Sequence, residues 1–128
     1  MENKNKAIED AIKAFINNRT EEQLADSLSV LRHCLDNELV VSVKQGEQGL
    51  TLNPVKTSDG RQWFTVFTSL EEQLKGKNQV QSMFSSPLSK IFMFALENID
   101  VAGVIINPYG DSMSLDRDIM RIVLGKRR

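Results

Sequence analysis

His33 and Cys34 are the only histidine and the only cysteine in the sequence, so they are the first candidates for catalytic chemistry. Neighbouring residues on a helix point about 100° apart, so these two side chains cannot form a nucleophile–base pair with each other. We expect Cys34 in the core, beside a stripe of leucines, and His33 in solvent. A zinc site needs three or four suitable ligands, and this pair does not supply them.

Two pairs of acidic residues are the next candidates, Glu71 with Glu72 and Asp116 with Asp118. Each pair falls in the first turn of a predicted helix, where the helix dipole stabilises carboxylates. This structural role accounts for both pairs. The glycines do not form a phosphate-binding motif. We therefore expect no enzymatic activity, no metal site and no cofactor.

The segment from Asn107 to Ser112 is the best candidate for a binding site. It follows an apolar strand, and its Asn-Pro-Tyr-Gly sequence favours a β-turn. Its side chains include an amide, an aromatic ring, an acid and a hydroxyl, from Asn107, Tyr109, Asp111 and Ser112. Such a strand end is a plausible recognition surface, although no histidine lies near Ser112 to activate it. The alternative stays open: Asn107 and Pro108 set the turn, and Tyr109 covers the edge of the core.

Trp63 and Phe64 are the other aromatic candidates for a binding surface. They are adjacent on a predicted strand, so their side chains point to opposite faces of a sheet. One of them is expected in the core, and an exposed ring on the other face would suit a protein interface. The alternative is that both rings belong to the core.

The composition is that of a globular domain and excludes several classes of protein. The chain has 128 residues, 41% of them hydrophobic and 26% charged, with a net charge of −1. That balance argues against a dedicated nucleic-acid binder, although residues 116–128 carry five basic and two acidic side chains that could meet nucleic acid or anionic lipid. The single cysteine favours a reducing compartment, and neither a secretory signal nor a membrane span is recognisable. We expect a cytoplasmic protein.

The pattern of apolar residues predicts an α+β fold. Apolar residues at helical spacing indicate a helical pair within residues 1–36. A mixed, mainly antiparallel sheet of about five strands should follow, with helices packed on it. The predicted strands cover residues 39–43, 50–56, 62–68, 101–106 and 112–115. Further helices are predicted at 69–74, 87–96 and 116–124, the second of them after a capping Ser86, and Asp59-Gly60 indicates a two-residue hairpin.

Two segments together resemble a known family. Trp-Phe-Thr-Val-Phe-Thr-Ser-Leu-Glu-Glu at 63–72 and Gly-Val-Ile-Ile-Asn-Pro-Tyr-Gly-Asp-Ser at 103–112 are similar to the SseB N-terminal domain family. The resemblance covers about residues 38–125 and implies a bacterial cytoplasmic α+β module. It implies no catalytic residue.

These observations lead to one domain and two hypotheses for its function. The domain comprises the helical pair at 1–36, the SseB-like core at 38–125 and a basic tail at 126–128. The first hypothesis is a non-catalytic interaction or regulatory module that binds a protein partner, with a homodimer as one form. The second is a domain that binds a small molecule resembling an amino acid.

Overall fold

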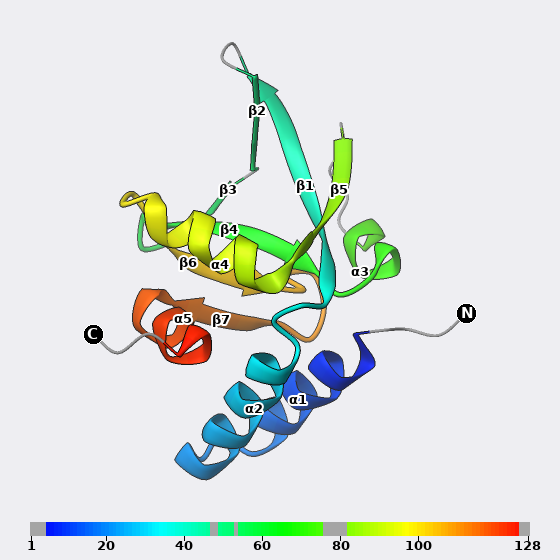
Figure 1. Cartoon of the computed structure of the whole chain (residues 1–128), viewed down its shortest axis with the longest axis vertical. Helices are drawn as coiled ribbons and strands as arrows, with labels where there is room; N and C mark the ends of the chain where they lie inside the picture. Colours follow the sequence, from blue (N-terminus) through cyan, green and yellow to red (C-terminus); the bar gives the residue numbers. More distant parts are fainter. Residues whose placement is uncertain (1–4, 47–48, 53, 76–81, 126–128) are drawn as a thin grey trace.

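The computed structural model describes residues 5–46, 49–52, 54–75 and 82–125. Within these residues the chain forms five helices and seven strands (Figure 1). The helices are α1 (Lys6–Asn17), α2 (Glu21–His33), α3 (Leu70–Leu74), α4 (Leu88–Glu97) and α5 (Arg117–Leu124). The strands are β1 (Glu38–Gly46), β2 (Gly49–Leu52), β3 (Pro54–Lys56), β4 (Gln62–Phe67), β5 (Ser82–Pro87), β6 (Val101–Ile106) and β7 (Met113–Asp116).

The strands form one mixed sheet, and the predicted α+β class is confirmed. The main order is β2-β1-β4-β6-β7, with β3 paired to β4 and β5 paired to β1. Only β4 and β6 run parallel among the described pairs, and the remaining pairs are antiparallel. The parallel pair brings the ends of two strands from distant parts of the sequence to the same edge.

The sheet has seven described strands, more than the five expected, for two reasons. The predicted strand at 50–56 is divided into β2 and β3, which pair with different partners, β1 and β4. The strand β5 was not predicted, because its serine-rich sequence has no alternation of polar and apolar residues. Ser86 was expected to cap α4, but it pairs with Leu39 in the sheet, and Pro87 occupies the cap position without a side-chain hydrogen bond.

Local signals at helix ends and turns were more reliable. Thr20 accepts a hydrogen bond from the Gln23 N–H at 3.1 Å, as its capping box predicted. Gly125 ends α5 with a φ of 80°. The Asp59-Gly60 hairpin joins β3 to β4, but its connection spans residues 57–61 instead of two residues, and only Gly60 has a positive φ.

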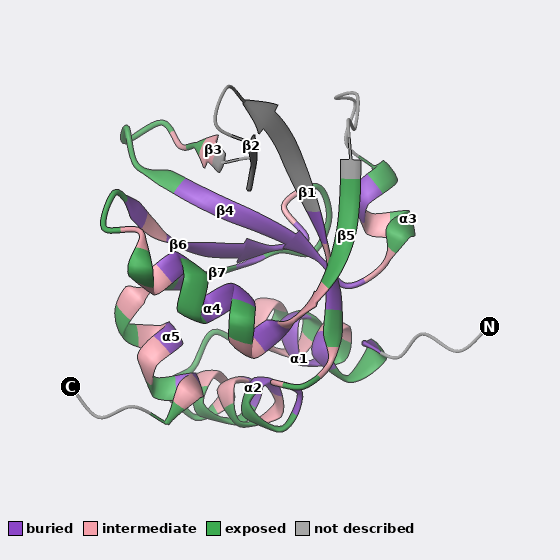
Figure 2. Cartoon of the chain, turned by 45° about the horizontal axis from the view of Figure 1, so that its top comes forward, coloured by how far each residue is buried: buried purple, intermediate pink, exposed green. Residues whose placement is uncertain are grey.

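One face of the sheet carries the main core. Val41, Phe64 and Val66 point toward the helices and share one cluster of buried side chains with Ile12 of α1 and Phe92 of α4. Figure 2 shows buried residues along β4, β6 and the inward sides of α1 and α4. The N-terminal helical pair is therefore part of the same core as the sheet.

Two arginine side chains donate hydrogen bonds to backbone carbonyls at the C-terminal ends of helices. Arg32 of α2 donates from Nε to the Val123 carbonyl at 3.2 Å and from its guanidinium to the Ile122 carbonyl, at the end of α5. Arg117 donates to four carbonyls at the end of α4 and just beyond it, those of Ala95, Leu96, Asn98 and Val101. Both arginines satisfy carbonyl groups that a helix leaves unpaired at its C-terminus.

Candidate functional site

The candidate site is built where the parallel strands β4 and β6 end side by side. Val66 of β4 stands opposite Ile106 of β6, and the Asn107 N–H donates to the Val66 carbonyl at 2.8 Å. This places the residue after β4, Thr68, against the residue after β6, Asn107. The carboxyl ends of adjacent parallel strands are where open sheets of this kind commonly hold their binding groups.

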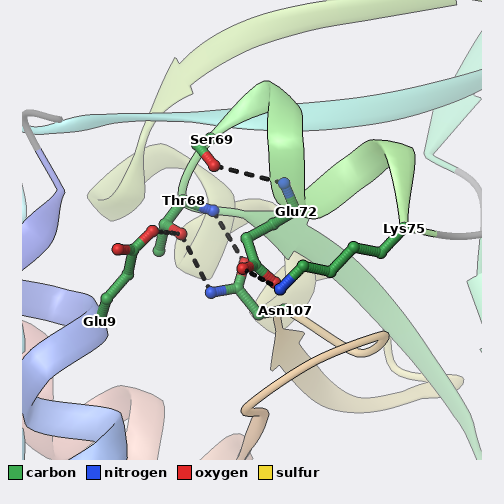
Figure 3. A network of polar contacts seen from close by, with 6 residues as sticks. All are labelled: Glu9, Thr68, Ser69, Glu72, Lys75 and Asn107. Atoms are coloured by element: carbon green, nitrogen blue, oxygen red, sulfur yellow. Dashed lines mark hydrogen bonds and ion pairs between the residues drawn. The ribbon is translucent and has the colours of Figure 1, made fainter. Parts of the chain in front are cut away.

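Asn107 holds the two strand ends together. Its side chain is buried, its φ is 55°, and its Oδ1 accepts from the Thr68 N–H at 2.9 Å. Its Nδ2 donates to the Thr68 hydroxyl at 3.0 Å, and that hydroxyl donates in turn to a Glu9 carboxylate oxygen of α1 (Figure 3). The Gly110 N–H donates to the Asn107 carbonyl at 3.1 Å and closes the predicted turn. Asn107 therefore has a structural function in fixing the turn.

Asn5, at the start of α1, extends this polar network, and no pattern in the sequence pointed to it. It is buried at 4% exposure, and its Nδ2 donates to the carbonyls of Thr68 at 2.9 Å and Glu38 at 3.0 Å. Its Oδ1 accepts from Asn37 at 3.3 Å. The start of α1, the start of β1 and the end of β4 are thus joined by one amide side chain.

The turn presents Tyr109, Asp111 and Ser112 at the surface. Tyr109 is 40% exposed, and its ring stacks on the buried Phe67 ring with 5.7 Å between centroids. Asp111 and Ser112 are exposed. The sequence left two interpretations of Tyr109, a surface group or a cover for the edge of the core. The structure agrees with both, because the ring is partly exposed and also covers Phe67.

Trp63 and Phe64 lie away from this surface, and both are buried. Their exposures are 7% and 4%. Phe64 stacks on Phe94 of α4 with 5.5 Å between ring centroids, and the Arg61 guanidinium lies 5.5 Å from the Trp63 ring centroid on the other face. Their positions agree with the alternative in which both rings belong to the core.

A small polar pocket adjoins the turn. Its volume is about 250 Å³, and its lining combines acidic and basic side chains. The charged members are Glu9, Lys13, Glu72, Lys75 and Asp111. Asn107 and Gly110 complete it. Both signs of charge therefore face one small volume.

The ion pair between Glu72 and Lys75 forms one wall of this pocket. Lys75 Nζ lies 2.6 Å from Glu72 Oε2, and Ser69 caps the helix by accepting from the Glu72 N–H at 3.3 Å (Figure 3). The hydrogen bond to Glu72 raises the pKa of Lys75 against an opposing desolvation, and the charges of Glu72, Asp111 and Glu9 add to the rise. Glu72 Oε1 is buried and has no hydrogen-bond partner among the described residues.

Cys34 and His33 occupy ordinary structural positions. Cys34 is buried in the core as expected, and burial raises the pKa of its thiol. His33 is exposed, with Nδ1 2.8 Å from the Ser29 carbonyl oxygen. Within the described ranges, no group of three or more histidine, cysteine, aspartate or glutamate side chains is arranged to hold a metal ion.

A comparison with known protein families identifies a match. The sequence model of the SseB protein N-terminal domain family matches residues 8–121. No curated protein matches the chain, and no solved structure matches it. The matched range begins inside α1, so it also takes in the helical pair that lay outside the resemblance over residues 38–125. Among the described residues, no helix combines the length and apolar character needed to cross a bilayer.

Proposed function

The chain belongs to the SseB protein N-terminal domain family, and from this premise we propose that it is a non-catalytic interaction module that binds a protein partner through the turn after β6. The binding surface is the exposed part of that turn, Tyr109 to Ser112, with the Glu72–Lys75 ion pair beside it. The observation that carries the proposal is a half-exposed tyrosine held on a rigid, hydrogen-bonded turn.

Tyrosine is well suited to this role. Its ring offers a large contact area with few rotatable bonds, and aromatic residues are enriched in the centres of protein interfaces. The ring of Tyr109 is already held by stacking on Phe67. Little conformational entropy would therefore be lost when a partner covers it.

The backbone beneath Tyr109 is equally restrained. Asn107 bonds to Thr68 through both ends of its amide, and the Gly110 N–H closes the turn. The neighbouring charges of Glu72, Lys75 and Asp111 provide a polar rim of both signs. An aromatic anchor with a polar rim is the usual arrangement of a protein-binding surface.

Site-specific photocrosslinking tests this proposal. A benzophenone amino acid at position 109 should give a discrete protein adduct in cells that express the chain. The matched control carries the same group at Ile99, which is 86% exposed. Adding Asp111→Lys to the first protein should remove the adduct without lowering its melting temperature.

The identified partner then permits a quantitative test. Tyr109→Ala should weaken its binding at least about tenfold, as loss of a central aromatic anchor does. An equal adduct at both positions, or none at position 109, would contradict the proposal. So would a partner whose affinity is unchanged by Tyr109→Ala.

The polar pocket supports a second candidate function, the binding of a small zwitterion such as an amino acid. Lys13 and Lys75 could meet a carboxylate, while the unpartnered Glu72 Oε1 could accept from an ammonium group. A volume of about 250 Å³ suits a ligand of that size. A thermal-shift screen with millimolar amino acids should then raise the melting temperature, and Glu72→Gln should abolish the rise. A flat screen would refute this candidate.

A further inference from the structure

The strand β5 forms an outer edge of the sheet, on the far side of β1 from β4. Its register with β1 runs from Ser82 opposite Val43 to Pro87 opposite Glu38, and no described strand pairs with its other side. Figure 1 shows β5 rising alongside β1 at this edge. The outer side of β5 is therefore a row of backbone groups with which no described strand pairs.

The residues of β5 themselves carry none of the usual features that block pairing. Natural edge strands carry a charged side chain, an internal proline or a bulge that blocks another strand. The sequence Ser-Met-Phe-Ser-Ser-Pro has no charge, and its proline comes only at the end. Met83 and Phe84 are 41% and 47% exposed. The strand thus offers apolar side chains on both of its faces.

The hydrogen bonds to β1 show which backbone groups point outward. In an antiparallel ladder, residues bonded to the neighbouring strand alternate with residues whose N–H and C=O point away. The Leu88 N–H donates to the Asn37 carbonyl at 3.0 Å, and these residues flank the pair of Glu38 with Pro87. That pair is therefore a non-hydrogen-bonded one, and Pro87 directs its carbonyl away from β1.

The same alternation fixes the rest of β5. Phe84 and Ser86 direct their N–H and C=O toward β1, whereas Met83 and Ser85 direct theirs outward. A partner strand would find two complete residues to bond with, one on each side of Phe84. Proline at position 87 offers no N–H and sets the limit of the pairing.

We propose that β5 pairs antiparallel with β5 of a second copy of this chain, about a twofold axis at Phe84. Met83 of each copy then stands opposite Ser85 of the other copy, and each such pair exchanges both of its backbone hydrogen bonds. Phe84 faces Phe84 of the second copy as a non-hydrogen-bonded pair, the closer of the two spacings. Aromatic rings directly opposite each other in this way stabilise a sheet.

A second copy fits this edge because the strand is complementary to itself. Twofold pairing brings like residues together at the axis, so a charge near the axis would repel its own copy. No residue from 82 to 87 is charged, and the net charge of the chain is only −1. Met83 and Ser85 each direct one N–H donor and one C=O acceptor outward, and they meet equal numbers of acceptors and donors on the second copy. The pairing also stops at two copies, because it occupies the outer side of β5 in both of them.

Sedimentation equilibrium tests the proposal, and the wild-type chain is expected to dimerise with a Kd below about 500 μM. Ser85→Pro should abolish the dimer and leave the monomer folded, because it removes an N–H that points outward. Ser85→Thr is the matched control, since it keeps that N–H and should keep the dimer. A monomeric wild-type chain at about 500 μM would overturn the proposal. A dimer that survives Ser85→Pro would overturn it as well.

A charge exchange at the axis gives a second test that does not depend on proline. Phe84→Lys and Phe84→Glu should each be monomeric, because two like charges would meet at the axis. Mixed in equal amounts, the two variants should form a heterodimer at low salt, since opposite charges then face each other. Failure of the mixture to associate would overturn the proposed register, and dimers of either variant alone would overturn it too.

Discussion

The turn after β6 and the outer edge of β5 are two exposed regions of one sheet, and they keep their backbones in place by different means. In the turn, side chains satisfy the backbone: Asn107 bonds to Thr68 through both ends of its amide. Among the described strands, β5 pairs only with β1, and the groups of Met83 and Ser85 point outward. The turn therefore offers selected side chains to a partner, whereas the outer edge of β5 offers the backbone itself.

The largest expected effect breaks the turn. Asn107→Ala should lower the free energy of unfolding by about 3 kcal/mol, because it leaves the Thr68 N–H without a partner and puts alanine at a positive φ. Urea denaturation should show a lower midpoint with an unchanged slope. Ser112→Ala, at an exposed position of the same turn, should change stability by less than about 0.5 kcal/mol. Equal effects of the two substitutions would contradict the structural role of Asn107.

The next prediction compares the loss of an N–H that points toward β1 with the loss of one that points away from it. Ser86→Pro removes an N–H that bonds to β1 and should cost about 2 kcal/mol or more, whereas Ser85→Pro should cost under about 1 kcal/mol. Both should be measured in a Phe84→Lys background, which removes any contribution from dimerisation. If the order were reversed, the assignment of outward groups on β5 would be wrong.

A somewhat smaller effect is expected beneath the turn, at Asn5. Asn5→Ala should cost about 1.5 kcal/mol, because the carbonyls of Thr68 and Glu38 lose their donor. Asn5→Asp should cost at least as much, since a carboxylate would face those two oxygens. If urea denaturation showed a smaller loss of stability for Asn5→Asp than for Asn5→Ala, the hydrogen-bond donor of Asn5 would not explain the effect.

The smallest effect concerns the pocket wall. A Cβ at position 110 would lie 2.8 Å from Glu72 Oε1 and 3.1 Å from Lys75 Nζ, so Gly110→Ala should push the ion pair apart. The raised pKa of Lys75 should then fall toward its ordinary value, as NMR of the ammonium group would show. In the wild type the pair stabilises the fold below the ordinary lysine pKa, and that contribution is lost as pH rises through the raised value. An unchanged Lys75 pKa in the alanine variant would contradict the contact.

Features that depend on neighbouring residues could be predicted from the sequence. Thr20 with Gln23, Gly125 after α5 and the turn at Asn107 each depend on a few adjacent side chains. The apolar run from Val101 to Ile106 indicated a buried strand for the same reason. These signals were enough to give the α+β class and to place Cys34 in the core.

Features that depend on distant residues could not be predicted. Asn5 bonds to Thr68, 63 residues away, and nothing local distinguishes it from the other asparagines near the N-terminus. No local pattern in the sequence indicated that β4 pairs parallel with β6, and this pairing brings Thr68 next to Asn107. The edge strand β5 was missed because its partner β1, not its own sequence, makes it a strand. The binding functions of Tyr109, Asp111 and Ser112 stay predictions.

The contact of Arg32 with the end of α5 has a consequence for how the chain folds during synthesis. Arg32 lies 90 and 91 residues before the carbonyls of Ile122 and Val123 to which it donates. At about 5–20 residues per second, a ribosome needs roughly 5–18 seconds to make the intervening chain. The helical pair emerges early, yet one of its anchors does not exist until much later. Ile12 and Leu31 of this pair also share a core cluster with Met120 and Val123 of α5, so part of their apolar surface stays uncovered until α5 has been made. That interval gives a chaperone time to bind.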